Sequence, residues 1–222
     1  MANKRALERM GWMLDQMEKE ARKRDAPVFR AEDSTKDTPF TILVFTMLSA
    51  RTKDSATTDA VARLFKKAKT PGQIASLGAR ELEELLYGVG FYRVKAKNLI
   101  AISKAIDGLG AVPDTLEGLM SLPGVGRKTA NIVLARAFGK NTLGVDVHVH
   151  RISNRLGMVK TKKPEETERA LLRIVPERYI RSLNRDFVAF GQTVCLPRNP
   201  KCDICPIRGL CERVGLSLRR RS

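Results

Sequence analysis

Hydrophobic residues recur along most of this chain at the three- and four-residue spacing of amphipathic helices. Residues 4–24 carry one apolar stripe with charged residues opposite, formed by Leu7, Met10, Leu14, Met17 and Ala21. That spacing predicts a helix with one buried face. Residues 40–50 are instead apolar nearly all round. Pro39 before them favours a core helix over a buried strand, because proline is tolerated at the first position of a helix.

The remaining pattern is also helical. Helices are predicted for a segment that Asp54 begins and that ends near Ala68, for a short segment after Thr70, and for residues 79–87, 94–106, 116–122, 164–175 and 178–190. Only residues 145–149 alternate in the manner of a strand. Residues 25–37 are polar and contain a proline, which predicts a linker. We therefore predict an all-α fold.

The break between two predicted helices is the run Leu-Pro-Gly-Val-Gly-Arg-Lys-Thr-Ala-Asn at residues 122–131. Pro123, Gly124 and Gly126 interrupt the helical pattern, which predicts helix, tight hairpin, helix. Glycines allow positive φ and a close approach of the backbone to a ligand. The second helix is expected to begin near Arg127, so that its free N–H groups form a site for an anion such as a phosphate. A similar Gly-Val-Gly at residues 88–90 indicates a faint internal repeat or shared turn chemistry.

Lys128 is expected in the first turn of that second helix, where the positive end of the helix dipole disfavours a lysine. Repulsion from the dipole and from Arg127 is expected to lower the pKa of Lys128, and a lysine amine is a nucleophile only when unprotonated. This segment alone favours a simpler role in phosphate binding. An acidic candidate follows in Gly-Val-Asp-Val-His-Val-His-Arg at residues 144–151, where Asp146 precedes a predicted helix as an ordinary N-cap.

All four cysteines lie in one pattern, Cys195-x6-Cys202-x2-Cys205-x5-Cys211. Thiols spaced this closely in an intracellular chain indicate a metal site rather than disulfides. Four-cysteine sites most often hold zinc, but zinc ribbons usually carry two Cys-x2-Cys pairs and this pattern has one. The spacing alone leaves zinc and a [4Fe–4S] cluster as alternatives.

The net charge of the chain limits the classes of partner that it is expected to bind. Lys and Arg total 41 against 24 Asp and Glu, which gives a net charge of +17 and a field that attracts polyanions. The basic residues are distributed along the chain, which favours nucleic acid over an anionic membrane surface. Aromatic residues make up only 5%, so contacts with duplex phosphates fit better than stacking on a single strand. No transmembrane-length run or secretory signal is found, and an intracellular protein is expected.

The hairpin run, the following Val-Asp-x-His-x-x-Arg at residues 145–151 and the cysteine pattern together resemble endonuclease III, of the helix–hairpin–helix DNA glycosylase superfamily, in an iron–sulfur, archaeal-like form. The resemblance covers about residues 39–211. It implies two lobes and a structural [4Fe–4S] cluster on the four cysteines. One lobe would be a six-helix domain of residues 30–140 with the helix–hairpin–helix at about 114–138. The other would be an iron–sulfur domain of residues 1–29 plus 141–222 with its cluster loop at 195–211.

The resemblance also implies the site residues. Lys128 would be the Schiff-base nucleophile, Asp146 the catalytic carboxylate, and duplex DNA would bind between the lobes. DNA contacts are expected from the hairpin, the segment after Asp146 and the cluster loop, namely Gly124, Val125, Gly126, Arg127, His148, Arg151, Arg198 and Lys201. His150 is expected to be structural, and a second metal site at residues 146–150 is disfavoured because glycosylase chemistry needs none.

Two positions depart from the bacterial pattern of this family. The family fills the gap left by a flipped base with a glutamine in a Ser-Ala-Gln loop and a leucine in a Gly-Leu-Tyr turn. Here Arg51 follows Ser49-Ala50, and Phe91 follows Gly90. An arginine would hydrogen-bond the orphaned base and a phenylalanine would wedge the base stack. The preferred opposite base and the range of lesions stay open.

The implied function is bifunctional DNA repair by a monomer. An N-glycosylase would remove oxidised pyrimidines from duplex DNA, and an AP lyase would cleave 3′ to the abasic site by β-elimination. One alternative is a mismatch or adenine glycosylase of the same superfamily, which usually lacks a lysine at position 128. Another is a non-catalytic, zinc-bearing DNA-binding module, which would need neither Lys128 nor Asp146.

Overall fold

The computed structural model describes residues 4–33 and 38–216, and every regular element in those ranges is a helix. The all-α prediction is confirmed. Residues 145–149, which alternate in sequence, form no strand, since 145 and 146 are irregular and 147–149 begin a helix. The chain divides into two compact units, each described by itself: unit 1 is Met1–Phe29 with Val145–Ser222, and unit 2 is Arg30–Gly144. No helix within the described residues is long and apolar enough to cross a membrane.

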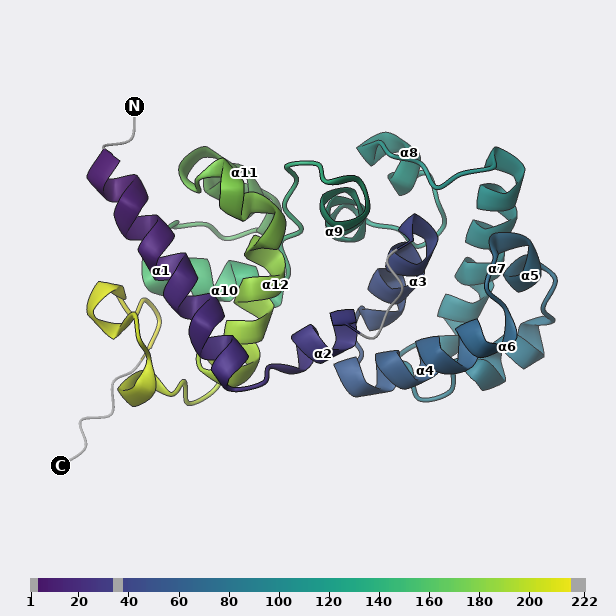
Figure 1. Cartoon of the computed structure of the whole chain (residues 1–222), viewed down its shortest axis with the longest axis horizontal. Helices are drawn as coiled ribbons and strands as arrows, with labels where there is room; N and C mark the ends of the chain where they lie inside the picture. The colour runs from purple at the N-terminus through teal and green to yellow at the C-terminus, as the bar shows by residue number, and fades with distance from the viewer. Residues whose placement is uncertain (1–3, 34–37, 217–222) are drawn as a thin grey trace. The chain divides into compact units, whose positions relative to one another are not determined.

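Unit 2 is organised around one helix that is apolar on nearly all sides. Helix α3 (Pro39–Ser49) buries eight of its eleven residues and packs against α4 (Asp54–Lys67), α7 (Tyr92–Leu109) and α9 (Arg127–Phe138) (Figure 1). The unit is completed by α5 (Pro71–Ala75), α6 (Ala79–Leu85) and α8 (Leu116–Met120). Thr38 begins α3, because its hydroxyl accepts from the Thr41 N–H over 3.2 Å and Pro39 occupies the first helical position.

The two Gly-Val-Gly turns of unit 2 share a geometry. Gly88 and Gly124 both have positive φ, at 95° and 76°. The valine after each glycine is buried, and its N–H donates to the leucine carbonyl three residues earlier over 3.1 Å in both turns. They differ where the next helix begins, since α7 follows a left-handed Phe91 whereas α9 follows an extended Gly126. The shared part is the turn itself.

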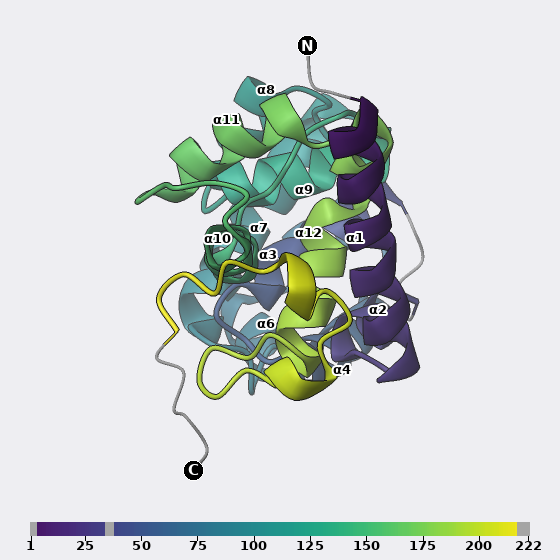
Figure 2. The ribbon, with the colours of Figure 1, turned by 90° about the vertical axis from the view of Figure 1, so that its left-hand side faces the viewer.

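Unit 1 is built on two long helices. Helices α1 (Lys4–Lys23) and α12 (Glu177–Thr193) lie side by side, and α12 also packs against α10 (Val147–Leu156), which packs against α11 (Pro164–Ile174) (Figures 1 and 2). Met17, Phe187 and Phe190 are fully buried. Two 3₁₀ turns, η1 (Cys202–Ile204) and η2 (Arg208–Leu210), shape the cysteine-bearing loop.

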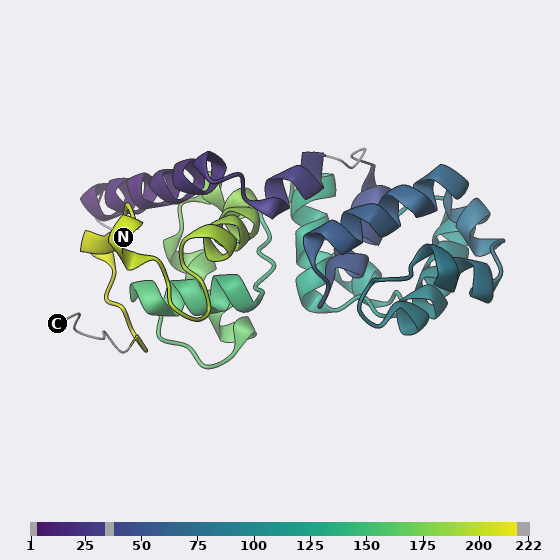
Figure 3. The same ribbon diagram turned by 90° about the horizontal axis from the view of Figure 1, so that it is seen from below.

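The linker predicted for residues 25–37 is wrong over most of its length. Residues 27–33 form helix α2 (Pro27–Asp33), visible in Figure 3, and residues 34–37 lie outside the described residues. Phe29 packs with Ala21, Ala26 and Ala189, and the Arg22 guanidinium lies 4.3 Å from its ring centroid. A helix of two turns offers too few apolar positions for a period to show in the sequence, so tertiary burial decides its structure.

Candidate active site and cysteine centre

The hairpin before α9 packs against the core on one side and is exposed to solvent on the other. Val125 is 5% exposed and belongs to the core, so only its backbone is available to a ligand. Gly124 packs against Asn98, whose Nδ2 would lie 2.3 Å from a Cβ added at position 124. A Cβ at Gly126 would meet nothing within 4 Å, and no side chain caps α9. The exposed face therefore presents Gly124, Gly126 and Arg127, as an anion site requires.

Lys128 is half-buried in the first turn of α9. Its charge adds to burial in lowering the pKa of a second lysine, Lys95, to about 8. The segment that leaves unit 2 is held against the same turn, because a Cβ at Gly144 would lie 2.8 Å from the Lys128 carbonyl oxygen. Asn131 Nδ2 donates to the Leu143 carbonyl over 3.1 Å, which fixes the segment along α9. Sequence reasoning did not single out Asn131.

Arg51 and Phe91 occupy two loops of unit 2 and share an uncommon backbone conformation. Both residues have left-handed φ, at 53° and 58°, and both are exposed. The Arg51 guanidinium lies 5.9 Å from the centroid of the Phe91 ring. Left-handed backbone at bulky residues costs about 1–3 kcal/mol each and is concentrated at functional sites. The structure therefore brings together the two residues that are predicted to fill the gap left by a flipped base.

Asp146 lies in unit 1 as the N-cap of α10. Its Oδ1 accepts hydrogen bonds from the His148 N–H over 2.8 Å and from the Val149 N–H over 2.9 Å. The side chain is half-buried, so the carboxylate is held at the positive end of the helix without being enclosed. This geometry fixes the orientation of the carboxylate group.

His148 and Arg151 form one cluster with the cysteine loop. Arg151 Nη2 lies 3.2 Å from His148 Nδ1 and donates to the Cys195 carbonyl over 2.9 Å. A Cβ at Gly191 would lie 2.2 Å from His148 Nδ1, so only glycine at that position of α12 admits the histidine ring. Burial lowers the pKa of Arg151, and its Nε is buried with no hydrogen-bond partner. Arg151 therefore links α10 to the cysteine loop. His150 has a structural contact, with Nδ1 2.7 Å from the Thr167 hydroxyl.

None of the four cysteines forms a disulfide, and together they line one cavity with the ends of α10 and α12. Among the described residues, no three His, Cys, Asp or Glu side chains are placed to hold a single metal ion. In a four-iron cluster each thiolate binds a different iron, so the sulfurs lie farther apart than around one zinc ion. Burial and, to a smaller extent, the charges of the other three cysteines raise the pKa of Cys205 to about 11, against a hydrogen bond from the Ile207 backbone that lowers it. Thiols crowded in this way become thiolates when a cationic centre binds them, as a metal ion or a cluster does.

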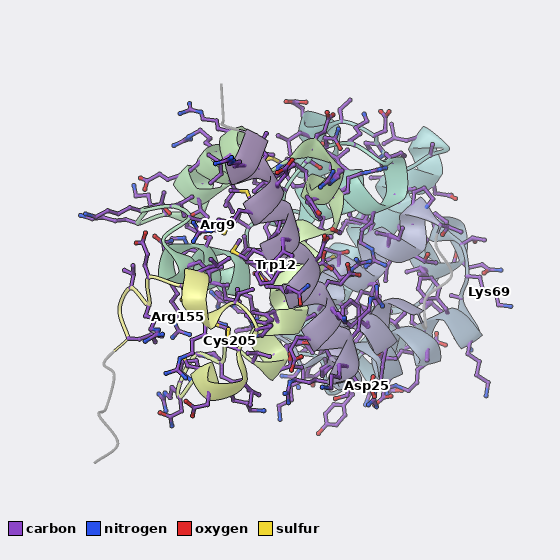
Figure 4. The ribbon with its side chains drawn as sticks, turned by 60° about the vertical axis from the view of Figure 1, so that its left-hand side comes forward. Arg9, Trp12, Asp25, Lys69, Arg155 and Cys205 are labelled. Carbon is purple, nitrogen blue, oxygen red and sulfur yellow. The ribbon has the colours of Figure 1, made fainter. Side chains whose placement is uncertain are left out.

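Arg155 holds the cysteine loop (Figure 4). This residue was not identified in the sequence analysis. Its guanidinium donates to the Leu196 and Pro197 carbonyls over 2.7 Å each, and Nη1 lies 3.6 Å from the Cys195 sulfur. Arg198 and Lys201 are exposed on the same loop, as a phosphate contact requires. The signal in the sequence was the position of Arg155 one helical turn after Arg151.

The predicted site residues thus fall into two groups. Unit 2 carries Lys128, the hairpin, Arg51 and Phe91, and unit 1 carries Asp146 and the cysteine centre.

Two family models match the parts of the chain that carry these two groups of site residues. Residues 44–177 match the family model of the HhH-GPD superfamily base excision DNA repair proteins, and residues 195–211 match the iron–sulfur binding domain of endonuclease III. Endonuclease III of Thermotoga maritima is 48% identical over 176 residues, which cover 78% of this chain and 83% of that protein.

Two solved structures resemble the whole fold. A non-covalent endonuclease III–DNA complex is 33% identical with a TM-score of 0.81, covering 93% of this chain and 95% of that one. A trapped endonuclease III–DNA covalent intermediate is 32% identical with a TM-score of 0.79 and the same coverage. The expected enzyme class and the [4Fe–4S] cluster are confirmed. The chain therefore belongs to the endonuclease III family of HhH-GPD base excision repair proteins and is a DNA glycosylase and AP lyase.

Proposed function

We propose that this enzyme removes oxidised pyrimidines from duplex DNA and then cleaves the strand 3′ to the abasic site. The observation that carries the proposal is the position of Lys128. It lies half-buried in the first turn of a helix that no side chain caps, directly after an open glycine hairpin. The hairpin amides and Arg127 are suited to hold a backbone phosphate, which would bring the sugar of that nucleotide toward the lysine amine.

The chemistry assigned to Lys128 begins with attack of its neutral amine on C1′ of the flipped nucleotide. The C1′–N bond to the base breaks, and the base leaves with a proton. Opening of the sugar ring at O4′ gives an imine between Nζ and C1′. Loss of a C2′ proton then expels the 3′-phosphate, and water hydrolyses the imine to return the free lysine.

Asp146 is assigned the role of counter-charge. Positive charge develops on the sugar as the base leaves, and an oriented carboxylate stabilises it. The carboxylate also suits proton transfer during ring opening and elimination. The cluster would be held by Cys195, Cys202, Cys205 and Cys211 and would supply a structural cross-link of residues 195–211 rather than electrons.

The remaining predicted residues are assigned to DNA binding. Arg51 and Phe91 would occupy the gap left by the flipped base. Phosphate contacts would come from the backbone of Gly124, Val125 and Gly126, and from Arg127, His148, Arg151, Arg198 and Lys201. We place the enzyme inside the cell, as a monomer on damaged duplex DNA.

A mismatch or adenine glycosylase is the second candidate, and Lys128 disfavours it because such enzymes need no lysine nucleophile. A panel of duplex oligonucleotides tests the choice, with base release and strand cleavage scored separately. Oxidised pyrimidines should give both products at matched rates. Release of undamaged thymine or adenine from mismatches, without strand cleavage, would overturn the proposal.

A further inference from the structure

A buried lysine connects the two loops that carry Arg51 and Phe91. Lys95 lies in the first turn of α7 and is 8% exposed. Its Nζ donates to the Leu48 carbonyl over 2.8 Å, to the Ala50 carbonyl over 2.6 Å and to the Thr52 hydroxyl over 3.1 Å. An ammonium group has three donors, and each of them has a protein acceptor here.

Two of the three acceptors, the Leu48 and Ala50 carbonyls, belong to the C-terminal end of α3, where helix carbonyls have no partners within their own helix. Lys95 therefore caps α3 from a different helix. Its positive charge also lies at the negative end of the α3 dipole, which is the favourable arrangement. An apolar side chain of the same length would fill the space but would leave these carbonyls without a donor.

The same contacts extend to the second loop. The Thr52 hydroxyl accepts from the Gly90 N–H over 3.1 Å in addition to Lys95, and it lies 3.2 Å from the Ala50 carbonyl. A Cβ at Gly90 would lie 2.5 Å from the Arg51 carbonyl oxygen, so the two loop backbones touch. We call residues 49–52 and 88–91 the paired loops.

Each paired loop contains a residue whose backbone conformation needs support from surrounding contacts. Arg51 and Phe91 are both left-handed, a region that side chains of this size rarely adopt. Strained conformations of this kind persist only where surrounding contacts determine them. Lys95 bonds Ala50 and Thr52, on either side of Arg51, and Thr52 accepts from Gly90, which precedes Phe91.

We propose that Lys95 is a positioning residue for base excision, which joins the paired loops through the end of α3 and thereby presents Arg51 and Phe91 in the geometry that fills the gap. The inference rests on the gap-filling role proposed above for these two residues. Lys95 itself touches no substrate.

The first test is Lys95→Met, with Lys104→Met as the matched control because Lys104 is an exposed lysine on the same helix. Amide exchange is measured on the DNA-free protein. Lys95→Met should raise exchange at the Thr52 and Gly90 amides at least tenfold, while the Ala130 amide in α9 stays unchanged. The control should change none of them. Unchanged exchange at Thr52 and Gly90 would overturn the proposal.

The second measurement compares two substrates. Lys95→Met should slow excision of a damaged base at least tenfold more than it slows cleavage of a preformed abasic site, whereas loss of general stability would slow both alike. Equal losses would assign Lys95 to stability alone. Fluorescence of 2-aminopurine opposite the lesion should likewise report a less filled gap.

A second variant keeps the test usable if Lys95→Met fails to fold. Thr52→Val keeps the shape of the side chain and removes the hydroxyl that receives both Lys95 and Gly90. It should give the same split between substrates, and the double variant should lose less than the sum of the two single losses. Additive losses would contradict a shared network.

The proposed function and this inference fail in different ways. If Arg51→Ala and Phe91→Ala leave base excision unchanged, the gap-filling role is wrong, but the exchange result still tests the connection between the loops. If those variants slow excision while Lys95→Met does not, the gap-filling role stands and the positioning role of Lys95 is wrong.

Discussion

Asp146 Oδ1 accepts a hydrogen bond from the Val149 N–H over 2.9 Å, so the proposed catalytic carboxylate is also the N-cap of α10. An aspartate at an N-cap is common and by itself indicates no catalysis. The two roles separate by substitution, because asparagine caps a helix about as well as aspartate but carries no charge.

Asp146→Asn should therefore keep the melting temperature and lose the activity. We expect base excision to slow by about a hundredfold or more, since the developing cation loses its counter-charge. Asp146→Ala should add a loss of about 1 kcal/mol in the free energy of unfolding, because the cap is removed as well. Calorimetry and single-turnover excision measure the two effects. Full activity in Asp146→Asn would leave Asp146 with capping alone.

Arg155→Met should loosen the cysteine loop. The partly buried Leu196 carbonyl and the exposed Pro197 carbonyl would lose their donor, so the loop would be held less firmly to α10. We expect faster loss of iron to a chelator, followed by absorbance near ~400 nm. Arg198→Met is the control, because Arg198 is exposed on the same loop. Equal rates of iron loss in the two variants would deny Arg155 this role.

Lys95 should make stability depend on alkaline pH. Burial, and then the charge of Lys128, lowers the pKa of Lys95 from 10.5 to about 8. Between these two pH values the unfolded chain therefore binds more protons than the folded chain. Burying the charged lysine lowers the free energy of unfolding by its full amount below about pH 8, and this loss is relieved as the pH rises toward 10.5. The melting temperature of the wild type minus that of Lys95→Met should increase across this range. A difference independent of pH would contradict the lowered pKa.

Binding to duplex DNA should weaken steeply with salt. With a net charge of +17, contacts to about four phosphates would reduce affinity roughly a hundredfold between about 50 and 200 mM salt. Arg198→Ala and Lys201→Ala should each lower the slope of log affinity against log salt by about 1. Lys104→Ala serves as the comparison. Slopes that match the wild type in both loop variants would remove the cluster loop from the DNA contacts.

The sequence predicts well wherever one local signal determines the structure. The glycine hairpin places Lys128 in the first turn of α9, and the spacing of Cys195 to Cys211 indicates a metal-binding loop, which the family resemblance assigns to a cluster. Helix α3 follows from its apolar run and its Thr38-Pro39 start. Each of these depends on chemistry within a few consecutive residues.

The sequence predicts poorly where distant segments decide. Helix α2 depends on Phe29 packing with alanines of α1 and α12. We predict Arg151 as a DNA contact, but the sequence did not show that its guanidinium also binds the Cys195 carbonyl, 44 positions along the chain. Lys95 falls on the same helical stripe as Leu99 and Ile102, and a lysine on an apolar stripe was the available signal of a buried amine. The acceptors at the end of α3 could not be read from the sequence.

Covalent trapping tests the central claim most directly. Borohydride reduces an imine between Lys128 and the sugar, so wild-type enzyme should be captured on DNA that carries an oxidised pyrimidine. Lys128→Gln should give no captured complex and no strand cleavage, yet should bind the same DNA within a fewfold, because it removes one positive charge of 41. Covalent capture and cleavage at wild-type rates by Lys128→Gln would contradict the account.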